Sequence, residues 1–525
     1  MRAFRSPPPG VVLVNAFDRP YDNAVATART CYSPRGIVTA EEVAGLHIED
    51  PAGRARAGEK RDALARDIYE AGHHTTFQHA HFQFALTGVS RQFLWSFLHA
   101  HPFYNSEQVS QRYVEVKPDS FLVPDLGGEA QQVYETTVSM QMRAYQELTE
   151  LLVPVCASEY FDRFPARSRR PGPWEKEIRK KAQEIARYVL PVATLSYLYH
   201  TVSAITLLRY RRLARQYDAP DEQRIVVDRM VGELLKIDPN YSKLLEEPIP
   251  PEATLEAAVP APSPSESRRF REEFDAELGG AVSVLVDCKV GNETVLARAV
   301  REVLGLPASS LPDSEAIRLV LDPAKNPYIG ESLNLTSLSK LTRALAHPSW
   351  TFRKKLSHTA DSQDQRHRAT PGSRPALALA PPLEPDYIVP GIVRTDGRIL
   401  ARYREVMDRV WEGLGRLLAL GVEPETAIYV LPNAVAIRFT ESADLLALHH
   451  KMTMRLCYLA QEEIWRASLE EARAVRRVNP EIGRYLLPPC TQRFIAGTRP
   501  FCPEGRRFCG VPVWELDLDA YSRTI

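Results

Sequence analysis

The sequence has no excess of either charge and no long apolar run. Its 525 residues carry 66 Lys and Arg against 66 Asp and Glu, so overall charge gives no reason to expect nucleic acid or an anionic membrane as a partner. No stretch approaches the roughly 20 apolar residues that a membrane-spanning helix needs, and the Arg- and Pro-rich start lacks the apolar segment of a signal peptide. We therefore expect a cytoplasmic protein that contacts neither membrane nor nucleic acid.

Cysteine is scarce as well. Seven Cys, an odd number in a chain of this length, do not suit a disulfide framework. Four of them draw attention because three lie close together near the C-terminus, beside Gly and Pro, and the fourth lies on a preceding helical segment: Cys490, Cys502, Cys509 and Cys457. Four thiolates suit structural zinc, or an iron–sulfur cluster. The spacing is not of the CxxC type, so small buried residues or unpaired thiols are the alternative.

A compositional break divides the chain into halves. Residues 246–280 concentrate Pro, Ala, Ser and Glu without a hydrophobic period, which is typical of an extended linker. Across this break, residues 186–191 (ARYVLP) recur as 427–432 (AIYVLP), and further identities share the offset of 241 residues. Several matches in one register indicate a duplication. We expect a domain at 1–245, a linker at 246–280, a second domain at 281–489 and a cysteine-containing tail at 490–525.

Hydrophobic periodicity predicts strands and helices in both halves. Apolar strands at residues 12–14 and 284–286 precede helical patterns at 22–29 and 292–304, and residues 81–86 alternate like a half-buried strand. Further helical spacing covers residues 133–153, 175–210, 399–418 and 442–472. The expected fold class is therefore α+β (α/β), with helices dominating.

The window at residues 72–116 is dense in polar side chains. Its histidines are His73, His74, His79, His81, His99 and His101, and Arg91 and Arg112 accompany them. Such a group suits an anionic, hydrogen-bonding ligand. Zinc is a second interpretation, although the spacing is not that of zincins and no nearby Cys completes a set. A polar subunit interface is the third.

The same window resembles the signature of the flavin-dependent thymidylate synthases. That signature is RHRxxSxNxxSxR followed by Tyr, and it is preceded by GHxSxxEH and a Ser-Arg pair. The matching pieces are residues 72–79 (GHHTTFQH), Ser90 with Arg91, Ala100-His101-Pro102 on RHR, and residues 110–113 (SQRY). Downstream, Arg187 precedes VLP, residues 203–207 cover the family's NxRSL, and residues 219–224 cover its AQxEIR.

The second half resembles the family more faintly. Here Arg366 is aligned with the last Arg of the signature, and Ile428 replaces the Arg before VLP. Asp444 and Leu446 replace the Asn and Arg of NxRSL. Residues 460–464 (AQEEI) keep the later motif, which ends in Trp465 in place of Arg.

The resemblance implies a fold and an activity. Each half would be an antiparallel sheet flanked by long helices, and the chain would methylate dUMP to dTMP with methylenetetrahydrofolate, FAD and NADPH. Family members are homotetramers of about half this length. A tandem chain would therefore form a pseudo-tetramer from two copies, so we expect a homodimer.

The resemblance also implies roles for single residues. Arg224 would polarise the pyrimidine and, with Arg112, take part in catalysis. The residues expected to bind dUMP are Gln108, Ser110, Arg112, Arg187, Arg224 and Arg366. Those expected to line the flavin are His73, Thr75, Gln78, His101 and Ser203. Arginine forks suit a phosphate because two N–H groups can bind two of its oxygens at once.

Two alternatives stay open. Ala100 and Pro102 replace the arginines around His101, and Ser203 and Ile205 replace the Asn and Arg of NxRSL. The chain could therefore be a catalytically degenerate paralogue that binds a nucleotide or acts as a scaffold. It could also be a different flavin or folate enzyme on the same scaffold, which would bind flavin without making dTMP.

Overall fold

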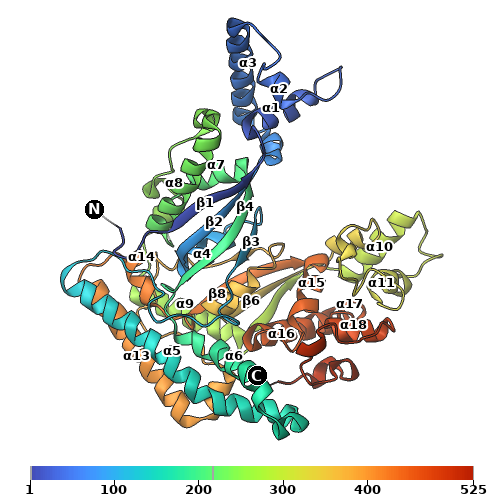
Figure 1. Ribbon diagram of the computed structural model, residues 1–525. Coiled ribbons are helices and arrows are strands. Elements are labelled where there is room, and N and C mark those ends of the chain that lie inside the picture. Colours follow the sequence, from blue (N-terminus) through green and yellow to red (C-terminus); the bar gives the residue numbers. More distant parts are fainter. Residues whose placement is uncertain (1–2, 216–217, 524–525) are drawn as a thin grey trace.

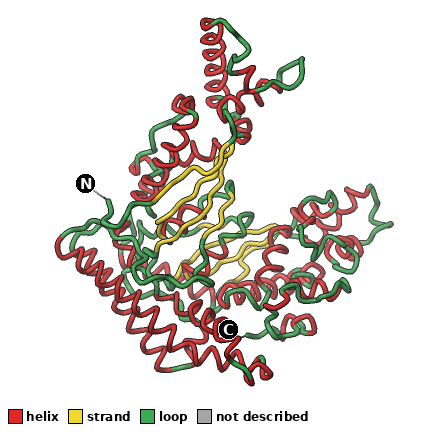
Figure 2. Tube along the Cα trace, in the orientation of Figure 1, coloured by secondary structure: helices red, strands yellow, loops and turns green. Residues whose placement is uncertain are grey.

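Each half of the chain builds one antiparallel sheet. The computed structural model describes residues 3–215 and 218–523, and within them the strand order is β1-β2-β4-β3 in the first sheet and β5-β6-β8-β7 in the second. Helices pack against both sheets (Figures 1 and 2). The expected α+β class and the antiparallel sheets are therefore confirmed.

The two halves share one plan of strands and intervening helices, to which the second half adds α9 before its first strand and α17 and α18 at its end. The first half contains β1 (Gly10–Ala16), α1 (Pro20–Thr30), α2 (Ala40–Val43), α3 (Pro51–Glu70), β2 (His81–Ser90), α4 (Arg91–His99), β3 (Asn105–Gln108), α5 (Gly128–Arg163), α6 (Glu175–Ala186), β4 (Leu195–Ser203), α7 (Ala204–Arg212) and α8 (Pro220–Ile237). The second half contains α9 (Pro264–Leu278), β5 (Ser283–Cys288), α10 (Asn292–Leu304), α11 (Asp313–Leu321), β6 (Ser349–Ser357), α12 (His358–Asp364), β7 (Gly372–Ser373), α13 (Gly397–Ala419), α14 (Pro424–Ala427), β8 (Ala436–Asp444), α15 (Leu445–Arg455), α16 (Glu462–Val478), α17 (Pro480–Gly483) and α18 (Pro489–Ile495).

The central strands explain why each sheet has one buried face. In β2, Phe82, Phe84 and Leu86 are buried and alternate with more exposed residues, as a strand with one covered face requires. In β6, the alternating buried residues include Trp350 and Phe352. Both strands end at a serine that caps the following helix, so the residue after it starts a helix at the sheet edge.

The helical pattern expected at 175–210 is wrong in its middle part, residues 187–203, whereas α6 and α7 confirm its two ends. Helix α6 ends at Ala186, Pro191 interrupts the helical course, and residues 195–203 form strand β4 in the middle of the first sheet. The pattern at 442–472 is likewise divided, between the end of β8, α15 and α16. The aromatic and β-branched side chains of β4 fit a pleated sheet better than a helix.

The segment expected to be an extended linker contains helix α9. Its Phe274 and Leu278 are buried, and Asp275 accepts hydrogen bonds from Lys355 and Arg438 of the second sheet. Helix α9 therefore covers part of that sheet. The capping box at Ser263 and Glu266 is the sequence signal for its start.

The two halves share a core. One hydrophobic cluster contains residues of both, including Tyr145 of α5 and Trp411 of α13, and these two long helices lie side by side (Figure 1). Gly413 on α13 faces Thr137 so closely that an added Cβ would collide with that side chain, so glycine allows the helices to approach. Backbone hydrogen bonds join the two YVLP segments, from Val192 N–H to the Leu431 carbonyl (2.8 Å) among others. No helix of the described residues is both long and apolar enough to cross a membrane.

Candidate functional site: an arginine cluster between the two halves

Arg91 begins helix α4 directly at the end of the central strand of the first sheet. Its side chain is buried and donates a hydrogen bond to the Gln108 amide oxygen at 2.7 Å. Burial lowers the pKa of Arg91 to about 10, and Arg187 and Arg366 contribute to that shift. A guanidinium in this position is surrounded by like charges.

Arg187 lies in the short 3₁₀ turn between α6 and the YVLP proline. It is 4% exposed, and its Nε and Nη2 have no hydrogen-bond partner within the described residues. Burial lowers the pKa of this arginine; Glu184 opposes the shift and Arg112 adds to it. Leaving buried donors unpaired costs about 1–3 kcal/mol each. This position therefore suits an anionic ligand that would accept both hydrogen bonds.

Arg112 follows β3 in the SQRY segment and reaches the second half of the chain. Its Nε donates to Glu184 at 2.9 Å, and its Nη2 donates to the Leu459 carbonyl at 2.8 Å. The Ser110 hydroxyl accepts the Arg112 backbone N–H at 3.3 Å. Burial would raise the pKa of Glu184, but Arg112, Lys181 and Arg187 hold it well below its usual range.

The second half adds two further arginines. Arg455 donates from Nε to His367 at 2.8 Å; burial lowers its pKa to about 10, and Arg366 and Arg112 add to this effect against Asp364. Arg366 is exposed, with its guanidinium 3.9 Å from the Glu107 carboxylate. We refer to Arg91, Arg112, Arg187, Arg366 and Arg455 as the arginine cluster. Both halves build it, and it reaches the surface at Arg366.

The expected nucleotide residues divide into two groups. Gln108, Ser110, Arg112, Arg187 and Arg366 belong to the arginine cluster or contact it. Arg224 does not: its ion pairs are with Asp221 (3.6 Å) and Asp228 (3.7 Å) in its own helix. The role expected for Arg224 stays a prediction, and the structure separates it from the other five in its contacts.

Strand register changes the alignment of the second half. Ser106 pairs with His200, and Gly372 pairs with Glu441; His200 and Glu441 are related by the offset of 241 residues. Ser106 and Gly372 are therefore equivalent positions. Six residues before each of them, Ala100-His101-Pro102 corresponds to Arg366-His367-Arg368. Arg366 therefore does not correspond to Arg112. It begins an RHR triplet that sequence reasoning missed, although the three letters themselves were the signal.

The two signature segments meet across the boundary between the halves. Arg368 donates to the Pro102 carbonyl and the Asn105 side chain, both at 3.3 Å. Trp95 of α4 donates to Asp361 of α12 at 2.7 Å. The half that has lost the flanking arginines of RHR is therefore in direct contact with the half that has kept them.

The residues expected to line a flavin lie around one end of the first sheet. His73, Thr75 and Gln78 are exposed, in and next to the 3₁₀ helix His74–His79. Ser203 pairs in register with His81, which follows that helix. His101 accepts the Phe103 N–H at Nδ1 (3.0 Å), so its Nε2 carries the proton shared with the Tyr210 hydroxyl at 2.9 Å. Burial lowers the pKa of His101 to about 4, with a contribution from Arg209, so the ring is neutral at pH 7.

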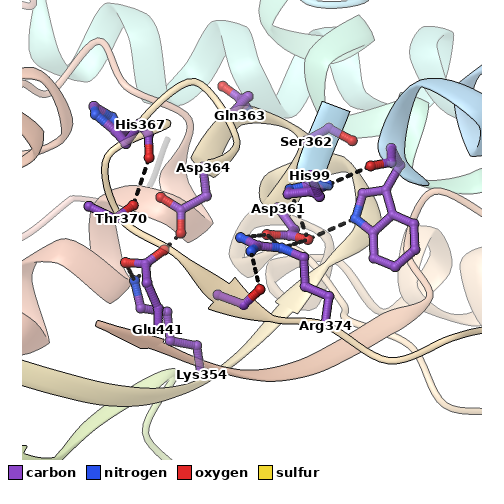
Figure 3. Close-up of polar contacts among 12 residues, drawn as sticks. His99, Lys354, Asp361, Ser362, Gln363, Asp364, His367, Thr370, Arg374 and Glu441 are labelled. Carbon is purple, nitrogen blue, oxygen red and sulfur yellow. Dashed lines mark hydrogen bonds and ion pairs between the residues drawn. The ribbon is translucent and has the colours of Figure 1, made fainter. Parts of the chain in front are cut away.

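The corresponding region of the second half is filled by buried charges. Figure 3 shows Lys354, Asp364 and Glu441 close together. Lys354 Nζ lies 2.6 Å from Glu441 and 2.7 Å from Glu471, and Lys451 Nζ lies 2.7 Å from Asp364; all five side chains are at most 1% exposed. Lys354 pairs with Phe439, and Leu86 of the first half pairs with Leu198. Because Leu198 and Phe439 are related by the offset of 241 residues, Lys354 and Leu86 are equivalent positions. Two ammonium groups thus pair with three carboxylates, and Glu441 Oε2 and Glu471 Oε2 have no hydrogen-bond partner within the described residues.

The position equivalent to Gln108 in the second half is Arg374. Its guanidinium donates to Asp361 at 2.8 Å (Nη2) and 2.9 Å (Nε) (Figure 3). Burial would raise the pKa of Asp361, but Arg374 and His99 hold it far below its usual range. This arginine is therefore paired with a carboxylate of its own half.

The four cysteines expected to bind a metal line one small cavity, of about 20 Å³. Within the described residues, no three His, Cys, Asp or Glu side chains are arranged closely enough to hold an ion in this structure. The metal therefore stays a prediction: Cys457, Cys490, Cys502 and Cys509 line one cavity, but they are not close enough together to coordinate an ion in this structure.

The fold and the arginine cluster together define a duplicated α+β protein with a cationic site between its copies. The family model described as "Thymidylate synthase complementing protein" matches residues 12–240 and again residues 286–481. The chain belongs to this family, as two consecutive copies.

Three of the relatives that the chain matches share one name. The flavin-dependent thymidylate synthase of Clostridium tetani is 28% identical over 236 residues, which cover 44% of this chain and 85% of that relative. The relative of the same name from Haloarcula marismortui is 25% identical over 257 residues, or 42% of this chain and 88% of its own. That from Sulfurisphaera tokodaii is 30% identical over 151 residues, or 28% and 57%. Each match covers less than half of this chain.

Proposed function

We propose that the chain is a flavin-dependent thymidylate synthase that methylates dUMP to dTMP, with methylenetetrahydrofolate as carbon donor and NADPH as reductant. The observation that supports this most strongly is the pair of unpartnered, buried donors on Arg187 beside Arg112 and Arg91. A nucleotide phosphate is an anion of suitable charge and acceptor number for them.

The phosphate would bind between the halves. Arg187 and Arg91 would donate to its oxygens, Ser110 would offer its hydroxyl, and Arg112 would stay oriented by Glu184 and the Leu459 carbonyl. The second-half arginines Arg366 and Arg455 would add positive potential at the entrance. One composite site would thus use both halves.

The residues at the end of the first sheet fit a flavin in part. When bound, FAD would supply the hydride and relay the one-carbon unit. The exposed side chains of His73, Thr75 and Gln78 could bind its polar groups. His101 would contact it through the ring face, because both ring nitrogens already hydrogen-bond within the chain.

The partner we propose is a second copy of the chain. On the outer face of the first sheet, Val12, Ala85 and Tyr199 follow one another across three strands, and Val12 and Tyr199 are more than half exposed. On the second sheet, helix α9 covers the equivalent face, with Glu277 paired to Arg353. The open face would be an interface of a homodimer, which gives a pseudo-tetramer of domains.

Light scattering tests this interface. The wild-type protein should have the mass of two chains, and Tyr199→Glu should have the mass of one chain. Equal masses for the two proteins would exclude this face as the interface.

The experiment that tests the activity starts with the visible absorption spectrum of the purified protein, before and after addition of FAD and dUMP. A bound flavin whose bands change with dUMP, followed by dTMP formation, supports the proposal. Flavin binding without dTMP formation would favour a different flavin enzyme. A colourless protein that ignores FAD would favour the degenerate paralogue.

The nucleotide site is tested separately by calorimetry with dUMP. Arg112→Ala and Arg187→Ala should each weaken binding by about 10- to 100-fold, as expected for lost charge-assisted hydrogen bonds. The control is Arg402→Ala, since Arg402 lies on α13 and pairs with Glu147. Equal affinity in all four proteins would remove the site assignment whatever the catalytic result.

A further inference from the structure

Three separate segments bring four of the seven cysteines to one point. Cys457 follows α15, Cys490 lies in α18, and Cys502 and Cys509 belong to the irregular tail after it. All four line the same cavity of about 20 Å³. A cavity of this size holds one water-sized particle. By contrast, Cys31 is exposed, and neither Cys156 nor Cys288 lines this cavity.

The surroundings of the four sulfurs are apolar. Leu456, Pro489, Val511 and Val513 line the same cavity. All four cysteines are only partly exposed. Four thiols packed together this way gain little from hydrogen bonding, whereas a dication would stabilise them as thiolates.

One of the four thiols has a hydrogen bond of its own in the structure. The Cys509 thiol donates to the Val511 carbonyl at 3.5 Å, which is a weak contact for sulfur. The proton in this contact is one that a metal ion would displace.

We propose that Cys457, Cys490, Cys502 and Cys509 together bind one Zn²⁺ ion as a closed, four-thiolate structural site. The sulfurs must contract around the cavity, because Zn–S bonds are about 2.3 Å long. On binding, each thiol loses its proton to solvent, so four protons leave as the dication enters. Four soft sulfur ligands are the usual set of a structural zinc site. Because they fill all four positions around the ion, the site would have no open position for catalysis.

The ion would tie the tail to the second domain. Three ligands lie beyond residue 481, where the second family match ends, and Cys457 lies inside it. The tail also packs on the domain core through Val513, Leu518 and Tyr521. The ion would therefore add a second attachment of the tail to the domain, beside these hydrophobic contacts.

The site also adjoins the arginine cluster. Cys457 is two residues from Leu459, whose carbonyl accepts the hydrogen bond from Arg112. The zinc would fix this carbonyl and thereby act as a positioning element for Arg112. Zinc binding does not depend on the proposed thymidylate synthase activity, so the two can fail separately.

The test is elemental analysis of the full-length protein purified without added metal. We expect one zinc per chain, a loss of most of it in Cys490→Ser and Cys502→Ser, and no change in the control Cys31→Ser. Iron with acid-labile sulfide would overturn the assignment in favour of a cluster. Zinc that stays in both ligand variants would also overturn it.

A second measurement covers variants that fail to fold. The wild-type protein is stripped of metal with a chelator and titrated with Co²⁺, which should give intense thiolate-to-cobalt bands and the visible bands of tetrahedral cobalt, saturating at one equivalent. No such bands, together with no zinc in the protein as purified, would exclude the site. Circular dichroism of the stripped protein checks that the rest of the fold is intact.

Discussion

Tyr429 of the second half donates a hydrogen bond to Glu222 of the first half over 2.7 Å. The relation is reciprocal, because Tyr188 of the first half donates to Glu463 of the second. Each buried glutamate also accepts from the serine that caps the helix after the central strand of its own half, at 2.6 Å from Ser90 and 2.7 Å from Ser357. The duplicated domains are therefore joined by two equivalent polar contacts inside a shared core.

Removing one of these hydroxyls should destabilise the whole chain. In Tyr429→Phe, Glu222 loses a donor in a site without water access, which costs about 1–3 kcal/mol of unfolding free energy. Tyr188→Phe should cost a similar amount, because it is the symmetric change. Urea unfolding followed by circular dichroism measures both. Tyr32→Phe is the control, since Tyr32 is 85% exposed; equal stability of all four proteins would show that the contacts contribute nothing.

The repeated architecture could be predicted because its signals are local. Helix α10 spans the predicted residues 292–304, where apolar positions recur at helical spacing between glycines. Strand β4 could not be predicted in the same way, because its apolar residues continue the period of α6 and only Pro191 marks the break. Tertiary pairing with β2 and β3 decides its conformation.

The candidate site was predictable in its residue types and less so in its grouping. Arg112 and Arg187 could be chosen because each stands at a fixed place in a motif. The hydrogen bond from Arg112 to the Leu459 carbonyl of the other half could not be predicted, because nothing local in sequence encodes how two domains dock. The buried position of Lys354 was equally hidden, since a lysine in an alternating strand is usually on the solvent side.

The duplicated chain should bind one dUMP, and not two. In the second half, Ile428 occupies the position that corresponds to Arg187. By the strand pairing of β3 and β7, Ala378 occupies the position that corresponds to Arg112. A cavity of about 410 Å³ lies beside Arg374, the equivalent of Gln108, but this arginine is paired with Asp361, and the carboxylates of Asp218 and Glu256 also line the cavity. Calorimetry should therefore give a stoichiometry of one nucleotide per chain. A value of two would show that this second position also binds.

Two glutamates at equivalent positions should contribute to the stability of the fold in opposite pH ranges. Glu184 and Glu425 are related by the offset of 241 residues, yet the arginine cluster lowers the pKa of Glu184, whereas burial, Asp221 and Glu423 raise the pKa of Glu425 to about 7. The raised pKa means that Glu425 stabilises the fold while it is protonated. This contribution is complete below its unfolded pKa of about 4.3 and is lost as the pH rises through about 7.

Glu425→Gln should therefore stabilise the protein relative to wild type at pH 8 by about 1–2 kcal/mol, with allowance for solvent screening, and change little at pH 5. Glu184→Gln is the matched comparison. The contribution of Glu184 is present above its unfolded pKa and is lost only as the pH falls through its depressed folded value, so this variant should be destabilised at both pH values. Thermal unfolding at pH 5 and pH 8 measures both. Identical pH profiles for the two variants would contradict the difference in charge between the two positions.

The buried charges around Lys354 should be strongly coupled. Lys354 is 1% exposed and faces Asp364, Glu441 and Glu471, and burial with the neighbouring Asp364 raises the pKa of Glu441 to about 7. In Lys354→Leu, which introduces the residue found at the equivalent position Leu86, the carboxylates would depend on Lys451 alone. Breaking such a network costs about 3–5 kcal/mol because uncompensated charge stays buried. The control is Lys355→Leu, on the opposite face of β6 and paired with Asp275, which should cost at most about 1 kcal/mol. Denaturant unfolding should separate the two variants clearly, and a Lys354→Leu protein as stable as Lys355→Leu would mean that the carboxylates are protonated and need no cation.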